Sequence, residues 1–215
     1  ALAAVSGSVN QIVTLIVEVF VGLTSGASVI IAQFYGAKDH KNLNRTLHTA
    51  YAFAIVTGAI VGLIGFWITE KVLIAMKTPS ELMADSVIYL HIYFCGMIFN
   101  IVYNMGASIL RAVGDSRRPL YVLIMTCGLN IFFDIMLVVF LKMGVMGVAI
   151  ATVSCQGISA CMVTWILIKG NSLFRLKIRE IRFYMASLQS VLRIGIPAAL
   201  EATMYTIANL IIQIF

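Results

Sequence analysis

The chain has 215 residues, of which 61% are hydrophobic and only 11% are charged, and its formal net charge is +6. A soluble domain is nearer half apolar and a quarter charged. A soluble fold of this length would leave apolar patches of the kind that cause aggregation. The composition therefore excludes an ordinary soluble protein and indicates a protein of the lipid bilayer.

Long apolar runs follow one another along the chain, at residues 5–34, 47–69, 82–110, 120–141, 145–168 and 188–215. A helix needs roughly 20 residues to cross the hydrocarbon, and it satisfies its own backbone in lipid. The strict alternation of a transmembrane barrel is absent from the sequence. The runs predict an all-α, polytopic transmembrane helix bundle of about six spans, in which the longer first and third runs tilt or extend past the membrane surface.

Both ends of the chain have the character of cut ends. Ala1 stands directly before an apolar run, and Phe215 lies inside another. No basic segment or cleavage site precedes the first run, so no signal peptide is predicted. We expect the chain to be an internal piece of a longer protein.

Basic residues alternate in number from one loop to the next. The first, third and fifth loops hold three, three and six Lys or Arg residues, whereas the second and fourth hold two and one. Cytoplasmic loops of membrane proteins carry such an excess. We therefore expect the first, third and fifth loops to be cytoplasmic.

The fifth loop is the candidate domain boundary and occupies residues 170–187. Its basic residues alternate with apolar ones, so we expect it to lie on the anionic cytoplasmic leaflet. A calmodulin-type target segment or a nucleic-acid patch is the alternative interpretation. Because the positive charge follows the loops, membrane lipid is the expected partner, and nucleic acid is not.

Asp134 lies near the middle of the fourth apolar run, where a carboxylate costs roughly 3 kcal/mol or more. Asn130 precedes it by four residues, so the two share one face of a helix. Carboxylate and amide oxygens are the ligands that hard cations prefer. The pair predicts a site for a cation or a proton.

Polar residues in the neighbouring runs extend this hypothesis. Asn104 lies in the third run and Thr152 in the fifth, each at a plausible depth to meet Asp134. The alternative is that Asn104 and Thr152 only form hydrogen bonds between helices.

Glu201 follows Pro197 by four residues in the last run. A proline removes a backbone hydrogen bond and can kink a helix, and a kink beside a carboxylate suits a moving element. The alternative is that Glu201 is near the helix end and merely solvated. Glu18, a third acidic residue within a run, has no assigned role.

The remaining residues favour structure over catalysis. The three histidines, His40, His48 and His91, show no metal-ligand spacing and are interpreted as structural. Glycines on helix faces predict close helix packing: Gly22, Gly26, Gly58, Gly62 and Gly65. No phosphate-binding loop, HExxH or GxSxG motif occurs in the sequence, so no enzyme is predicted.

Several segments resemble one family of transporters. Residues 22–28 (GLTSGAS) and 32–39 (AQFYGAKD) resemble the second helix and following loop of the multidrug and toxic compound extrusion (MATE) family, prokaryotic branch. Residues 110–119 (LRAVGDSRRP) resemble the segment after its fourth helix. Residues 194–201 (IGIPAALE) resemble the start of its seventh.

The resemblance covers essentially the whole chain. It implies part of a twelve-helix transporter with two six-helix lobes. Residues 1–169 would hold helices two to six of the first lobe, residues 170–187 the cytoplasmic linker, and residues 188–215 the first helix of the second lobe.

The resemblance also implies a coupling site for Na⁺ or H⁺, with no other cofactor. Asn130 and Asp134 match the family's fifth-helix Asn and Asp, Thr152 its sixth-helix Thr, and Asn104 a polar residue of its fourth helix. The family's first-helix Asp has no counterpart in this chain, so the site is incomplete here.

The implied function is secondary active transport. By alternating access, such a protein exports organic cations and drugs in exchange for Na⁺ or H⁺. Glu201, with Pro197, is similar to a helix-seven carboxylate that some branches use for coupling, at an offset that differs between branches. We expect a multi-pass protein of the bacterial plasma membrane that is monomeric at full length.

A flippase for lipids or lipid-linked oligosaccharides, of the same superfamily, is the main alternative. Flippases often line their cavity with basic residues, whereas the charges predicted at mid-membrane depth here are Glu18, Asp134 and Glu201. These acidic residues favour a cationic cargo. A membrane-embedded enzyme and a remnant that does not transport are the remaining alternatives.

Overall fold

The computed structural model describes the backbone of residues 2–75, 78–170 and 175–214. Side chains are described for residues 17–74, 78–170, 175–177 and 179–204. Every regular element within these ranges is helical. The elements are α1 (Leu2–Gly36), α2 (His40–Ala75), α3 (Ser80–Cys95), α4 (Met97–Ala112), α5 (Arg117–Asp134), the π-helix η1 (Ile135–Phe140), α6 (Gly144–Ile168), the 3₁₀ turn η2 (Ile178–Glu180) and α7 (Met185–Ile214). The predicted all-α fold is confirmed, and residue 215, at the end of the last run, lies outside the described residues.

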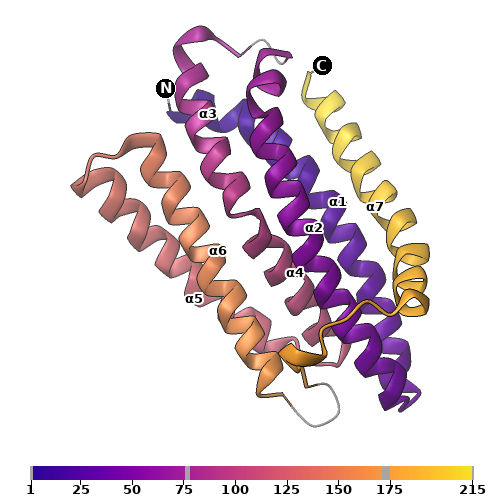
Figure 1. The fold of residues 1–215 in the computed structure, drawn as a ribbon. Helices are drawn as coiled ribbons and strands as arrows, with labels where there is room; N and C mark the ends of the chain where they lie inside the picture. The colour runs from indigo at the N-terminus through magenta and orange to yellow at the C-terminus, as the bar shows by residue number, and fades with distance from the viewer. Residues whose placement is uncertain (1, 76–77, 171–174, 215) are drawn as a thin grey trace.

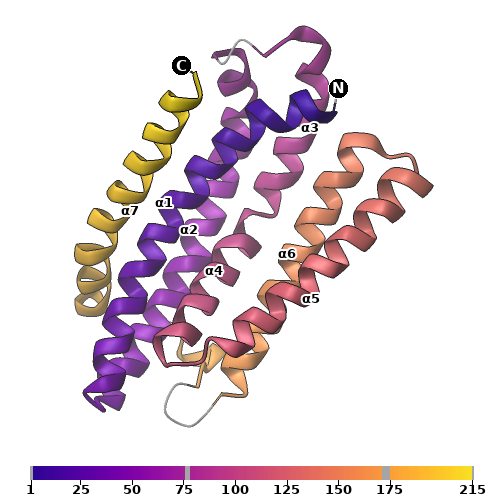
Figure 2. The same ribbon diagram turned by 180° about the vertical axis from the view of Figure 1, so that it is seen from behind.

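The long helices lie side by side (Figures 1 and 2). Helix α7 lies along α1 at one flank, and α5 pairs with α6 at the opposite flank. Helix α4 lies between them and contacts α1, α2 and α6. The bundle therefore places α4, α5 and α6, which carry the predicted cation site, next to one another.

The described residues contain four helices that are long and apolar enough to cross a membrane. The pair α3 and α4, bent by 47° at its break, makes a fifth span if it is counted as one. The described part of α7 is not among these spans. The multi-pass bundle is thereby confirmed, with four or five spans by this measure against the six apolar runs of the sequence.

The break between α3 and α4 falls at Gly96. The Gly96 N–H bonds to the carbonyls of Ile92 and Tyr93, at 3.1 and 3.0 Å, which tightens the last turn of α3. A Cβ atom at Gly96 would stand 2.6 Å from both methyl carbons of Val153 on α6. The glycine thus lets α6 approach the bend closely.

Glycines also bring other helix pairs together, as the sequence predicts. A Cβ at Gly22 or Gly26 of α1 would collide with the backbone of α7 at Ala199 or Gly195. A Cβ at Gly58 of α2 would lie 2.8 Å from the Cα of Ile98 on α4. Such close approach replaces hydrophobic burial as the source of helix association in lipid, where van der Waals packing stabilises the contact.

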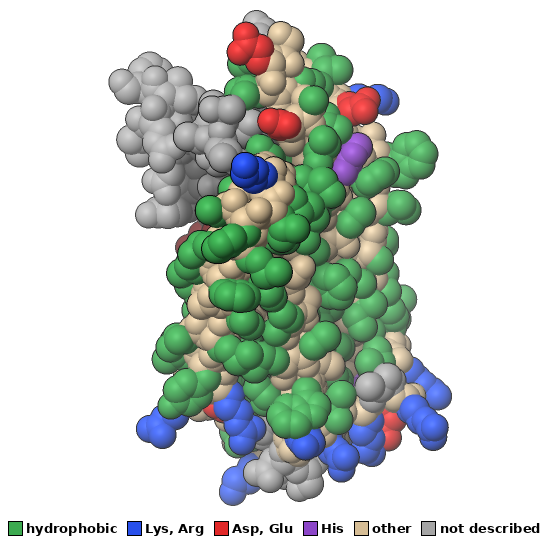
Figure 3. Space-filling model, turned by 90° about the vertical axis from the view of Figure 1, so that its left-hand side faces the viewer, with side chains coloured by type: hydrophobic (Ala, Val, Ile, Leu, Met, Phe, Trp, Pro, Cys, Tyr) green, Lys and Arg blue, Asp and Glu red, His purple; other side chains and the backbone are tan. Residues whose placement is uncertain are grey.

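Charge separates the two ends of the molecule (Figure 3). On the face shown, hydrophobic side chains cover the middle, and Lys and Arg side chains gather at one end. The loops α1–α2, α4–α5 and α6–α7 lie together at that end in Figures 1 and 2. These are the three loops that the sequence predicts to be cytoplasmic, so their clustering has the geometry that the prediction requires.

Candidate functional site

A cavity of about 390 Å³ lies between α1, α4, α5 and α6. Its walls carry more polar side chains than apolar ones, within an otherwise apolar bundle. The amide and hydroxyl groups among the lining residues are Asn100, Asn104, Thr126, Asn130, Thr152, Gln156 and Ser159. The structure therefore brings together Asn104, Asn130 and Thr152, which the sequence singled out on three successive runs.

The lining residues repeat at a spacing of four. Asn100 and Asn104 share a face of α4, Thr126 and Asn130 share a face of α5, and Thr152 and Gln156 share a face of α6. Residues four apart are neighbours on a helix surface. Three helices thus present parallel polar stripes to one space.

The sequence interpretation missed Asn100 and Gln156. Each lies one turn from a residue that was singled out, so the spacing itself is the signal that finds them. The Oε1 atom of Gln156 is buried and has no hydrogen-bond partner among the described residues. A buried polar atom without a partner requires an explanation, and a bound cation or water is a chemical fit for an amide oxygen.

Asp134 is the last residue of α5 and lies one turn beyond Asn130. It does not line the cavity itself. Its Oδ1 atom is buried without a hydrogen-bond partner in the described part of the chain. The carboxylate interacts electrostatically with Tyr89 of α3 and with Cys155 of α6, so it faces neighbouring helices.

The backbone changes its winding directly after Asp134. Residues Ile135–Phe140 form a π-helix, and the Leu141 N–H bonds to the Met136 carbonyl five residues earlier, at 3.1 Å. π-Helical turns are rare and are frequent at functional sites. The change of winding begins at the residue after Asp134, whose side chain is half-buried.

Two of the amide side chains already have partners. The Asn104 Nδ2 atom donates to the Asn100 carbonyl at 2.9 Å and to the Asn100 Oδ1 at 3.0 Å. The Asn130 side chain lies within hydrogen-bonding contact of the Cys155 thiol, a weak partner. The Asn104 bonds employ its amide nitrogen, which leaves the Asn104 oxygen available to a cation.

The structure places Glu201 and Pro197 away from this cavity. Both lie on α7 and are exposed, and neither lines the cavity between α1, α4, α5 and α6. Pro197 lies inside α7, which is assigned as one helix from Met185 to Ile214. A shared site of Glu201 with Asp134 is therefore not formed within the described residues.

The site offers oxygen ligands and no transition-metal set. Among the described residues there is no group of three or more His, Cys, Asp or Glu side chains with the geometry to hold a metal ion. A carboxylate with amide and hydroxyl oxygens suits a hard cation, and a carboxylate alone suits a proton.

Comparison with known proteins identifies the family. The sequence profile of the family described as MatE matches residues 1–136. The chain belongs to the MatE family. MatE is a family of membrane transporters and not of enzymes.

Curated relatives agree with the MatE assignment. The chain is 30% identical to the "Probable multidrug resistance protein YoeA" of Bacillus subtilis over 100% of its own length and 48% of the relative's. It is 28% identical to the "Probable multidrug resistance protein NorM" of Thermotoga maritima over 91% of the chain and 43% of the relative. The chain spans about half the length of the curated relatives it matches.

Solved structures share the fold. An inward-facing MATE family transporter aligns with a TM-score of 0.87 at 23% identity, over 95% of this chain and 47% of the other. An outward-facing one aligns with a TM-score of 0.89 at 23% identity, over 96% and 46%. The bundle described above is therefore about half of the helical architecture of MatE family transporters.

Proposed function

We propose that this chain forms the ion-coupling half of an antiporter that exports organic cations in exchange for Na⁺ or H⁺. In this proposal, residues 1–169 belong to the first lobe, residues 170–187 are the cytoplasmic linker, and residues 188–215 begin the second lobe. The protein lies in the bacterial plasma membrane.

One observation carries the proposal: the Asp134 carboxylate has a buried oxygen without a hydrogen-bond partner among the described residues, one helical turn from a polar cavity. Removing a carboxylate from water is costly unless it is paired. A coupling cation supplies the missing partner when it binds and takes it away when it leaves. Asn130, Thr152 and Asn104 supply further oxygens from three helices.

The mechanism follows from binding that differs between two conformations. A cation that binds the Asp134 site in one conformation shifts the population toward that conformation. An organic cation bound to the other conformation is then released. Exchange requires that the two ligands favour different states, and a half-buried carboxylate with one enclosed oxygen responds to such a change.

The charges available for cargo are acidic. Glu18, Asp134 and Glu201 are the charged residues predicted to lie near the middle of the membrane, and their acidic character opposes an anionic, lipid-linked cargo. One structurally similar protein is described as a "MOP superfamily transporter" from Pyrococcus furiosus in which "reverse polarity of binding pocket suggests different function". Pocket polarity is thus the feature on which the choice of cargo depends.

The test is transport by the full-length protein with Asp134→Asn. We expect ion-driven efflux of an organic cation from proteoliposomes to fall to the background level, because an amide neither takes up a proton nor balances a cation's charge. Expression should remain normal. Unchanged efflux would contradict the proposal.

Two further variants complete this experiment. Asp85→Asn is the matched control, since Asp85 lies on α3 outside the polar cavity, and we expect it to transport like the unaltered protein. Glu201→Gln tests the proposed role of the α7 carboxylate beside Pro197. If Glu201→Gln keeps full transport and an unchanged pH response, Glu201 takes no part in ion coupling.

A further inference from the structure

The loop between α6 and α7 is fastened to α2 at two points. The Lys177 N–H donates to the Nε2 atom of His48 at 3.1 Å. The Tyr184 N–H donates to the Oγ1 atom of Thr49 at 3.1 Å. His48 and Thr49 are both buried, with 3% and 0% of their surface exposed, so the docked loop covers two adjacent polar residues of α2.

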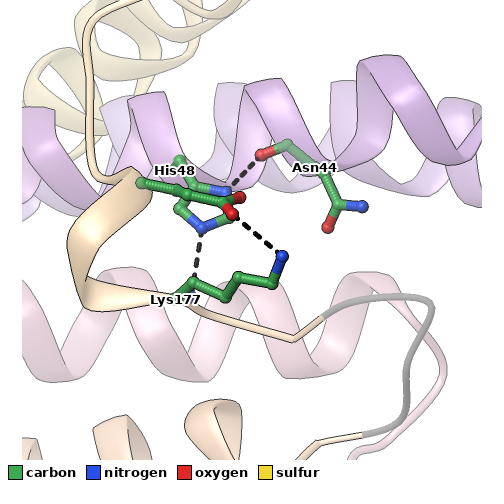
Figure 4. Close-up of polar contacts among 4 residues, drawn as sticks. Asn44, His48 and Lys177 are labelled. Atoms are coloured by element: carbon green, nitrogen blue, oxygen red, sulfur yellow. Dashed lines mark hydrogen bonds and ion pairs between the residues drawn. The ribbon is translucent and has the colours of Figure 1, made fainter.

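The hydrogen bonds of His48 define its protonation state. Its Nδ1 atom lies 2.7 Å from the carbonyl oxygen of Asn44, one turn earlier on α2. A carbonyl only accepts, so Nδ1 carries a proton. The Lys177 N–H only donates, so Nε2 carries none. Figure 4 shows the ring between Asn44 and Lys177, and this pair of contacts fits the neutral imidazole alone.

We propose that His48 is a pH-sensitive latch, which holds the α6–α7 loop on α2 when its imidazole is neutral and releases the loop when Nε2 takes up a proton. A protonated Nε2 cannot accept from Lys177, and two N–H groups then oppose each other in a buried place. The neighbouring contact of Thr49 with Tyr184 involves no titratable group, so it persists, and the release is confined to the part of the loop around Lys177.

Charged residues of the loop lie near His48. Glu180 has electrostatic interactions with His48, Arg182 and Lys177. The Lys177 ammonium, 2.8 Å from Glu180 Oε1, holds the pKa of the Glu180 carboxyl below its usual value. Glu180 therefore stays ionised over the range in which a histidine changes charge.

The direction of the pH effect follows from which state binds the proton. The docked loop requires neutral His48, whereas the released loop leaves Nε2 free to take up a proton. Docking is therefore complete at the alkaline end of the range in which a histidine changes charge, about pH 8 to about pH 5.5. It weakens as the pH falls, by about tenfold for each pH unit once the released form is protonated.

The test is hydrogen–deuterium exchange of the full-length protein in lipid nanodiscs, followed for the peptide that contains Lys177. Protection is corrected for the chemical exchange rate at each pH. We expect it to fall from about pH 8 to about pH 5.5 by at least tenfold. Flat protection in the unaltered protein would overturn the proposal.

Variants distinguish release of the loop by His48 protonation from a general loss of protection in the protein at low pH. In His48→Gln, an amide oxygen accepts from Lys177 at every pH, so we expect protection without pH dependence. His40→Gln is the matched control, because His40 is exposed at the start of α2, and it should keep the pH profile. A His48→Gln profile identical to that of the unaltered protein would overturn the proposal. If this variant does not fold, the profile of the unaltered protein decides.

The latch does not rest on the cation site. The exchange measurement needs no transported ion, so Asp134→Asn should show the unaltered pH profile even where it abolishes transport. Thr49→Val should lower protection around Tyr184 at every pH without changing the pH dependence at Lys177. Loss of the pH dependence in Asp134→Asn would show that proton uptake at Asp134, and not at His48, releases the loop, and would overturn the proposal.

Discussion

Thr126 and Asn130, one turn apart on α5, differ in the hydrogen bonds that their side chains make. The Thr126 hydroxyl donates to the carbonyls of Val122 and Leu123 on its own helix, at 2.9 and 3.2 Å. The Asn130 amide meets only the weakly polar thiol of Cys155 among the contacts described above. Both residues line the cavity, but only Asn130 has an oxygen that is not committed within its helix.

This difference gives a paired prediction for cation affinity. Asn130→Ala removes one oxygen ligand and should raise the cation concentration for half-maximal transport about tenfold, or about 1.4 kcal/mol. Thr126→Val, of nearly equal volume, should leave that concentration unchanged. Ion titrations of efflux by both variants provide the measurement, and equal effects of the two changes would contradict a ligand role for Asn130.

At the scale of elements, α1 and α7 make the most extensive contact of any helix pair in the described ranges. Gly22 and Gly26 of α1 face Ala199 and Gly195 of α7 so closely that a Cβ atom on either α1 glycine would overlap backbone atoms. Backbone cannot yield as a flexible side chain does. The contact is consequently the one in the bundle most sensitive to a single added methyl group.

Gly26→Ala should destabilise the protein by about 1–3 kcal/mol, the usual cost of overpacking. Gly128→Ala is the matched control. Gly128 lies in the middle of α5 with no atom within 4 Å of an added Cβ, so this change should be neutral or stabilising by up to about 1 kcal/mol. Thermal unfolding in detergent, followed by tryptophan fluorescence, compares the two. Equal midpoints would contradict the close-packing account.

Helices were predictable from the sequence, but their irregularities were not. Lipid requires long apolar runs, so the runs at 47–69 and 145–168 map directly onto α2 and α6. The break at Gly96 depends on how closely Val153 of α6 approaches. The π-helix after Asp134 is a matter of backbone hydrogen bonding. Neither leaves a pattern in local hydropathy.

The candidate site was predictable in part for a similar reason. The spacing of four between Asn130 and Asp134 follows from helix geometry alone, and the same rule finds Gln156 from Thr152. His48 was interpreted as structural because the histidines show no metal-ligand spacing, and its bond to Lys177 joins residues 129 positions apart in the chain. A contact between a helix and a distant loop leaves no periodic signal in the sequence.

At the scale of the whole molecule, the clustered basic loops predict its orientation. In a full-length protein whose native cysteines have been replaced, Glu81→Cys should react with a membrane-impermeant thiol reagent on intact cells. Glu81 is exposed at the start of α3, at the end of the bundle opposite the basic loops. Arg117→Cys, exposed at the start of α5, should react only after the membrane is opened. Labelling of Arg117→Cys on intact cells would contradict the assigned orientation.

The fastening of the α6–α7 loop also bears on where a transporter of this kind can hinge. Helix α7 packs along α1 through the glycine contacts, and the loop before it is bonded to α2. While the loop remains docked, we expect α7 to move together with α1 and α2, the helices that hold it.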